Sequence, residues 1–98
     1  MSKPLSLNLA DPGSRPYFLW DEPTTVAEFR LRLASDDPET RARSLQRLLR
    51  EARFEDVWKF TTPQHVADSW ATVGNKLGRR RSFWEFILKA WREHGLIR

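Results

Sequence analysis

The sequence contains no cysteine, and other features that define common protein classes are also missing. Without cysteine the chain has neither disulfide bonds nor thiolate ligands for a metal ion, which suits the reducing cytoplasm where we expect the protein to be located. No apolar run approaches the roughly 20 residues of a membrane-spanning helix, so we expect no membrane partner. The N-terminus has no basic segment followed by an apolar one, and we therefore expect no signal peptide.

Residue types that carry out catalysis are also scarce. The two histidines, His65 and His94, have no partner at a spacing typical of a metal site. The neighbours Glu55 and Asp56 would diverge on one helix, whereas catalytic carboxylates face each other across a cleft. The sequence also has no phosphate-binding loop, no dinucleotide fingerprint and no nucleophile elbow. We expect no enzymatic activity, no cofactor and no metal site.

The residues that are abundant are apolar or basic. The 98 residues are 40% hydrophobic and 12% aromatic, which is enough for one domain with a modest core. The formal net charge is +4, and 13 of the 17 basic residues are arginine. Because the planar guanidinium group donates paired hydrogen bonds, arginine favours recognition of carboxylates and phosphates. The same arginines are equally compatible with solvated helix faces.

Proline and turn residues divide the chain into a leader and one domain. Pro4 and Pro12 interrupt residues 1–15, which are predicted to be a flexible leader. Residues 16–98 are predicted to form a single helical domain, since signals for the start of a helix recur through them.

These signals are capping residues and helix-starting prolines. Thr25 and Glu28 have the spacing of a capping box, and Asp37 precedes Pro38 as a favourable N-cap. The expected helices therefore begin after Thr25, at Pro38, within residues 53–60, at Pro63 and at Ser82. Ser82 and Glu85 have the spacing of a second capping box. The last helix is expected to end near His94, with Gly95 as its C-cap. We predict an all-α fold: a compact bundle of four helices plus one short helix, with an extended aromatic N-terminal arm.

The last helix carries apolar residues over roughly 200° of its circumference, against about 100° for an ordinary amphipathic helix. One interpretation is a central helix that packs on two neighbours. The other is that the edge around Trp84 and Leu88 docks a partner, because aromatic residues are enriched at interface hot spots.

Two groups of arginines are candidate binding residues. Arg79, Arg80 and Arg81 precede the last helix, on the unfavourable side of its dipole, which indicates either an external anion or a solvated loop. A second basic face lies on the helix that starts at Pro38, and it is either a docking surface or an ordinary solvated face. Its residues are Arg43, Arg47 and Arg50.

A run of four large apolar residues lies between Pro16 and Pro23. It fits neither a strand nor a helix with one solvated face. The run is either an arm folded over the core, where it would meet Trp58, or a binding strip that contacts the partner. In the second case the contacting residues are Tyr17, Phe18 and Trp20.

Two segments, RPYFLWDEP (15–23) and ARFEDVWKF (52–60), together resemble a group of small, mostly uncharacterised bacterial helical proteins. These proteins carry a Pro-Tyr-aromatic-aromatic-Trp-Asp segment, a helix, and an Ala-x-Phe-Glu-Asp-Val-Trp-Lys-aromatic segment. The likeness spans residues 16–92, and Leu19 stands where an aromatic residue is commoner. The matching positions are Pro16, Tyr17, Phe18, Trp20, Asp21, Phe54, Glu55, Asp56, Val57, Trp58 and Lys59.

Genes of this group often lie beside a gene for a nucleotidyltransferase of the abortive-infection type, in the arrangement of a toxin–antitoxin pair. The resemblance implies a protein-binding, antitoxin-like partner that neutralises a nucleotidyltransferase toxin by covering its active-site cleft. One alternative is a small basic nucleic-acid-binding regulator, although the last helix lacks the polar cluster that reads base edges. Another is a structural subunit with no toxin.

Overall fold

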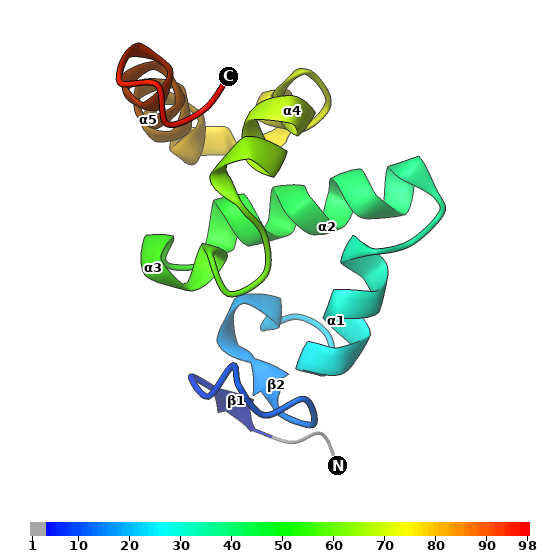
Figure 1. The fold of residues 1–98 in the computed structure, drawn as a ribbon. Helices are drawn as coiled ribbons and strands as arrows, with labels where there is room; N and C mark the ends of the chain where they lie inside the picture. Colours follow the sequence, from blue (N-terminus) through cyan, green and yellow to red (C-terminus); the bar gives the residue numbers. More distant parts are fainter. Residues whose placement is uncertain (1–3) are drawn as a thin grey trace.

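The longest helix, α2 (Pro38–Glu51), crosses the middle of the molecule in the computed structural model, which describes residues 4–98 (Figure 1). It contacts elements from both ends of the chain. In chain order, the other elements are β1 (Leu5–Ser6), β2 (Arg15–Pro16), the 3-10 turn η1 (Tyr17–Leu19), α1 (Val26–Leu33), α3 (Phe54–Val57), α4 (Pro63–Val73), the 3-10 turns η2 (Gly74–Lys76) and η3 (Gly78–Arg80), and α5 (Arg81–Glu93). The described chain is 62% helix and 4% strand, and it is compact and mainly helical.

The predicted starts of α1 and α2 are confirmed. The Thr25 side chain accepts a hydrogen bond from the backbone N–H of Glu28, and the Glu28 carboxylate accepts one from the backbone N–H of Thr25, which completes the capping box. Asp37 accepts hydrogen bonds from the backbone N–H groups of Glu39 and Thr40. Pro38 occupies the first turn of α2, where its missing N–H costs nothing.

The core forms where α2 meets its neighbours. One face of α2 is apolar, and the side chains on it are fully buried. The short α3 follows directly and confirms the short helix predicted within residues 53–60. The buried residues that α2 and α3 contribute are Leu45, Leu48, Leu49, Ala52 and Val57.

Helix α4 begins as predicted and ends at a glycine that has no room for a side chain. The Thr62 hydroxyl accepts a hydrogen bond from the backbone N–H of His65. At the other end, a Cβ atom on Gly74 would lie 2.7 Å from the Trp70 ring. Trp70 therefore packs over the bare backbone of Gly74, where the chain passes from α4 into η2.

The predicted capping box of the last helix is wrong, whereas its predicted C-cap is confirmed. The chain enters α5 from η3 with Arg80 already in a helical conformation, so Ser82 lies inside the first turn and caps nothing. At the other end, Gly95 has a φ of 72°, and the backbone N–H of Leu96 donates to the carbonyl of Trp91. This is a Schellman motif, which needs the left-handed conformation that glycine adopts without strain.

The first residues depart from the all-α prediction, because β1 and β2 form a two-stranded parallel pair (Figure 1). Residues 4–15 also lie against the domain: Leu9 is buried, and the backbone N–H of Val26 donates to the carbonyl of Ser14. The flexibility of the leader stays a prediction, and its residues 1–3 lie outside the described part of the chain. Between residues 4 and 98, no helix is long and apolar enough to cross a membrane.

The N-terminal ends of α1 and α5 allow a direct test of capping. Thr25→Ala removes a side-chain cap and should reduce the free energy of unfolding by about 1 kcal/mol. Ser82→Ala removes no cap and should change it by less than about 0.5 kcal/mol. Denaturant midpoints of the two variants check this, and a Ser82→Ala loss equal to that of Thr25→Ala would contradict the start of α5 at Arg81.

Candidate partner-binding surface

The aromatic run near the N-terminus belongs to the core of this chain. Phe18 and Leu19 are buried, and the Phe18 ring meets those of Phe29 and Phe60 at centroid distances of 5.2 and 5.6 Å. The run is not an extended arm, because Tyr17–Leu19 form the turn η1. The prediction that Phe18 contacts a partner is therefore wrong.

Tyr17 joins the two segments that carry the family resemblance. Its hydroxyl donates a hydrogen bond of 2.6 Å to Asp56 and accepts one of 2.8 Å from the backbone N–H of Arg53. The two segments lie 39 residues apart in sequence at this contact. The phenolic group therefore fixes η1 against the start of α3, which gives Tyr17 a structural role, while its contact with a partner stays a prediction.

Asp56 is the centre of this junction, with only 2% of its surface exposed. In addition to Tyr17, it accepts a bond of 2.9 Å from the Lys59 ammonium group and one of 3.2 Å from the Arg53 guanidinium group. Burial by itself would raise the pKa of Asp56, but hydrogen bonds from Tyr17, Lys59 and Arg53 outweigh it and hold the pKa below its ordinary value. The carboxylate is therefore charged and fully satisfied within the fold.

Arg47, from the predicted second basic face, holds the other end of the aromatic run. Its guanidinium group donates to the carbonyl of Phe18 at 2.9 Å and to the Asp21 carboxylate at 2.6 Å. It also lies 5.3 Å from the centre of the Trp20 ring, which is 57% exposed. Arg47 thus stabilises the fold, and Trp20 is the most exposed residue of the predicted binding strip.

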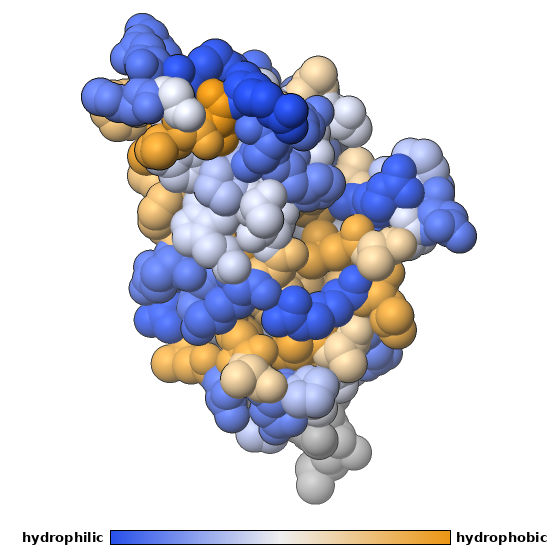
Figure 2. Space-filling model, in the orientation of Figure 1, coloured by the Kyte–Doolittle hydropathy of each residue, from blue (hydrophilic) through white to orange (hydrophobic). Residues whose placement is uncertain are grey.

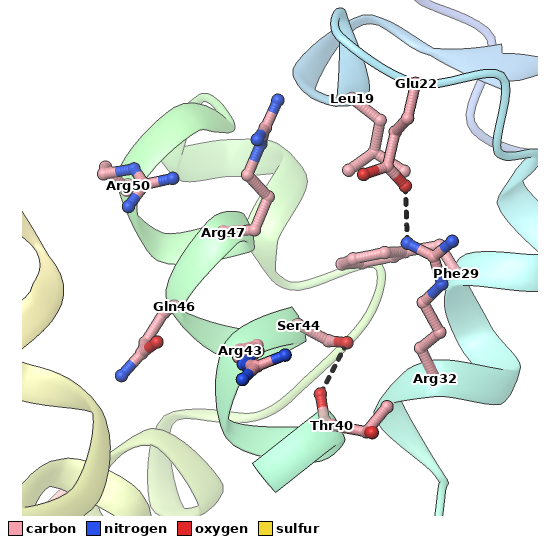
Figure 3. Close-up of a pocket in the computed structure, with 10 residues that line it drawn as sticks. All are labelled: Leu19, Glu22, Phe29, Arg32, Thr40, Arg43, Ser44, Gln46, Arg47 and Arg50. Atoms are coloured by element: carbon pink, nitrogen blue, oxygen red, sulfur yellow. Dashed lines mark hydrogen bonds and ion pairs between the residues drawn. The ribbon is translucent and has the colours of Figure 1, made fainter.

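The other arginines of the second basic face, together with Arg32 of α1, are also paired with carboxylates of this chain. They line a hollow of about 410 Å³ between η1, α1 and α2 (Figure 3). Arg43 pairs with Glu39, Arg50 with Glu51, and Arg32 with Glu22. Since each positive charge has a negative neighbour, this face is a weak attractor for an external anion.

Helix α5 faces the core with the residues that the sequence placed on its docking edge. Trp84 and Leu88 are buried, and the indole N–H of Trp84 donates to the carbonyl of Leu49 at 2.9 Å. The predicted docking edge at these two residues is therefore wrong. Phe83 and Phe86 are the exposed residues of the wide apolar arc, at 40% and 69% exposure. Figure 2 shows apolar side chains among hydrophilic ones at the end of the molecule where α5 and the C-terminal segment lie.

The predicted Arg79–Arg81 run borders a second hollow, of about 520 Å³. We call it the basic–aromatic hollow, and its lining residues are Arg53, Phe54, Glu55, Arg79, Arg80 and Phe83. Three of these six are cations, two are aromatic and one is acidic. The hollow therefore brings residues from α3, η3 and α5 to one place on the surface.

The three arginines of the run differ in their contacts. Arg79 is exposed and has no hydrogen bond or ion pair with any residue from 4 to 98. Arg80 donates to the carbonyl of Ala52 at 2.9 Å, a neutral acceptor that fixes the group and leaves its charge in place. Arg81 points to the other side, where it pairs with Glu85 at 2.6 Å. Of the predicted anion-binding residues, Arg79 and Arg80 are the two whose charge is not neutralised.

No direct signal in the sequence marks Phe83 and Phe86 as surface residues. The buried stripe of α5 runs through Trp84, Leu88 and the half-buried Trp91, at i, i+4 and i+7. At 100° per residue, both phenylalanines lie on one side of that stripe, and this offset is the only local indication of their exposure. Across residues 4–98, no group of three or more histidine or acidic side chains could hold a metal ion.

In comparisons with known proteins, no family model, no curated protein and no solved structure matches this chain.

The Asp56 junction predicts a specific pH dependence of stability. Since the folded-state pKa lies below the ordinary value near 3.9, the stabilisation is complete above that value and is lost as the pH falls toward the folded-state pKa. Asp56→Asn should reduce the free energy of unfolding by about 2–4 kcal/mol at neutral pH, because it leaves Tyr17 and Lys59 without the charge that they bind. The loss should shrink below about pH 4.

Urea unfolding at several pH values measures this difference, and Glu55→Gln is the matched control. Glu55 is the exposed neighbour of Asp56, so its variant should stay within about 0.5 kcal/mol of the wild type at every pH. Equal stability of Asp56→Asn and Glu55→Gln at neutral pH would refute the role of the junction.

Proposed function

We propose that this chain is a protein-binding, antitoxin-like partner that neutralises a nucleotidyltransferase toxin by covering its active-site cleft. The observation that carries the proposal is the basic–aromatic hollow, where Arg79 and Arg80 keep their charge beside the partly exposed ring of Phe83. Interfaces are enriched in arginine and aromatic residues, and these supply most hot spots.

The charge of the hollow supports an acidic partner surface. A nucleotidyltransferase would hold its metal ion and nucleotide with carboxylates, which give its cleft a negative potential. A basic surface that approaches such a cleft is steered toward it, and the attraction raises the association rate. The resemblance of residues 16–92 to proteins encoded beside such enzymes supports the same partner.

The alternative, a nucleic-acid-binding regulator, has less support. Binding to duplex DNA depends on many cations that are free to contact phosphates. Three arginines of α2 are paired with Asp21, Glu39 and Glu51, and Arg41 alone on this helix has no carboxylate partner among residues 4–98, so α2 presents no broad free basic face. The hollow alone offers too few cations for this mode of binding.

Where the gene beside this chain's own encodes a nucleotidyltransferase, co-expression with that enzyme tests the proposal. We expect a complex that co-purifies and cells that survive expression of the toxin. Arg79→Glu should slow association about tenfold at low salt and reduce its dependence on salt, because steering charges act mainly on the association rate. Arg43→Glu, an equal charge change outside the hollow, should leave the rate near that of the wild type.

A wild-type chain that neither co-purifies with the transferase nor protects cells would refute the proposal. Nanomolar, sequence-selective binding to duplex DNA in about 0.15 M salt would favour the regulator instead. Association that slows equally in Arg43→Glu and Arg79→Glu would show that general charge, and not the hollow, attracts the partner.

A further inference from the structure

The basic–aromatic hollow continues along α5 into an apolar strip. Phe83 lines the hollow, and Phe86 lies three residues further on, so the two rings are neighbours on one face of the helix. Phe86 is 69% exposed, so this large apolar ring is open to solvent next to Phe83. The combined surface therefore has a cationic end at Arg79 and Arg80 and an apolar end at Phe86.

Two of the three cations that line the hollow are held in position before any ligand arrives. The bond from Arg80 to the carbonyl of Ala52 holds that guanidinium group at the hollow. Arg53, which also lines the hollow, is held by Asp56 at 3.2 Å. The side chain of Arg79 has free donors for a carboxylate, since no residue from 4 to 98 binds it. A carboxylate that enters here therefore meets two arginines whose ordering cost has largely been met within the fold, and it orders Arg79 on binding.

The middle of the surface is equally rigid. The Phe83 ring contacts those of Phe54 and Trp84 edge to face, at centroid distances of 5.7 and 5.4 Å. Trp84 is in turn fixed by its bond to Leu49. Phe83 is therefore a surface ring supported by other aromatic rings. A partner's apolar side chain can pack on it at little cost in conformational entropy, because the ring is already held in place.

We propose that this surface receives one segment of a partner protein, a helix with adjacent acidic residues followed one turn later by bulky apolar residues. The carboxylates bind Arg79 and Arg80, and the apolar side chains cover Phe83 and Phe86. The one-turn offset follows from the spacing of the surface, because Phe83 follows Arg80 by three residues, about one turn of helix. This inference rests on the proposed function, and it names the part of the partner that the hollow recognises.

Two observations favour a protein segment over a nucleotide. Glu55 lines the hollow and would repel a phosphate dianion more strongly than a carboxylate. A small ligand within the hollow would also leave Phe86 uncovered. A second copy of this chain is disfavoured because both copies carry a net charge of +4.

A labelled peptide tests this inference without the transferase. The peptide is a stapled helix with two adjacent glutamates followed by leucine and phenylalanine three and four positions later. Binding is measured by fluorescence anisotropy and by amide chemical shifts of the full-length chain. We expect saturable binding with shifts at residues 78–86, weakened at least about tenfold when the glutamates become glutamine or the apolar pair becomes alanine.

Matched variants of the chain locate the binding site. Arg79→Gln and Phe86→Ala should each weaken the peptide about tenfold, since each removes one end of the surface. Arg43→Gln and Leu31→Ala change equally exposed residues elsewhere and should have no effect. Thermal unfolding of all four variants should match the wild type, because none of the four residues is buried.

The outcomes separate this inference from the proposed function. Peptide binding at residues 78–86 without a transferase complex would refute the proposed function and support the inference. A transferase complex that is unchanged in Phe86→Ala, or a peptide that fails to bind, would refute the inference alone. Adenosine monophosphate or a short oligonucleotide that binds through Arg79 but not Phe86 would identify a nucleotide site instead, and self-association in sedimentation would identify a second copy.

Discussion

The buried carboxylate of Asp56 is the interaction on which the rest of this structure depends. It accepts hydrogen bonds from Tyr17, Arg53 and Lys59, and so joins the start of the domain to α3. A buried charge is stabilising only when its partners are in place, which makes the junction sensitive to the loss of any of them. Because Arg53 also lines the basic–aromatic hollow, the same carboxylate orients one wall of the proposed binding surface.

The junction also divides the aromatic residues between the interior and the surface. With Tyr17 bound to Asp56, the ring of Phe18 is directed into the core, and Arg47 closes over the segment from the other side. The two segments that resemble the antitoxin-like family are therefore mainly structural. The proposed partner surface lies on η3 and the start of α5, away from the aromatic run.

Local features of the fold could be predicted from sequence, and long-range ones could not. Thr25, Asp37 and Gly95 were predicted correctly, because a cap is decided by a few neighbouring residues. Ser82 fits the same local pattern, but the turn η3 enters α5 in a helical conformation that the pattern does not register. The wide apolar arc of α5 was compatible with a central helix or with a docking edge at Trp84 and Leu88. Only tertiary packing decides that these two side chains are buried.

The central claim is that the chain binds its partner through η3 and α5, while the aromatic run serves the fold. Hydrogen–deuterium exchange of the chain, alone and in complex with the co-expressed transferase, tests this most directly. The account predicts slower exchange at residues 78–86 in the complex and unchanged exchange at residues 15–23. Slower exchange at residues 15–23 with no change at residues 78–86 would contradict it.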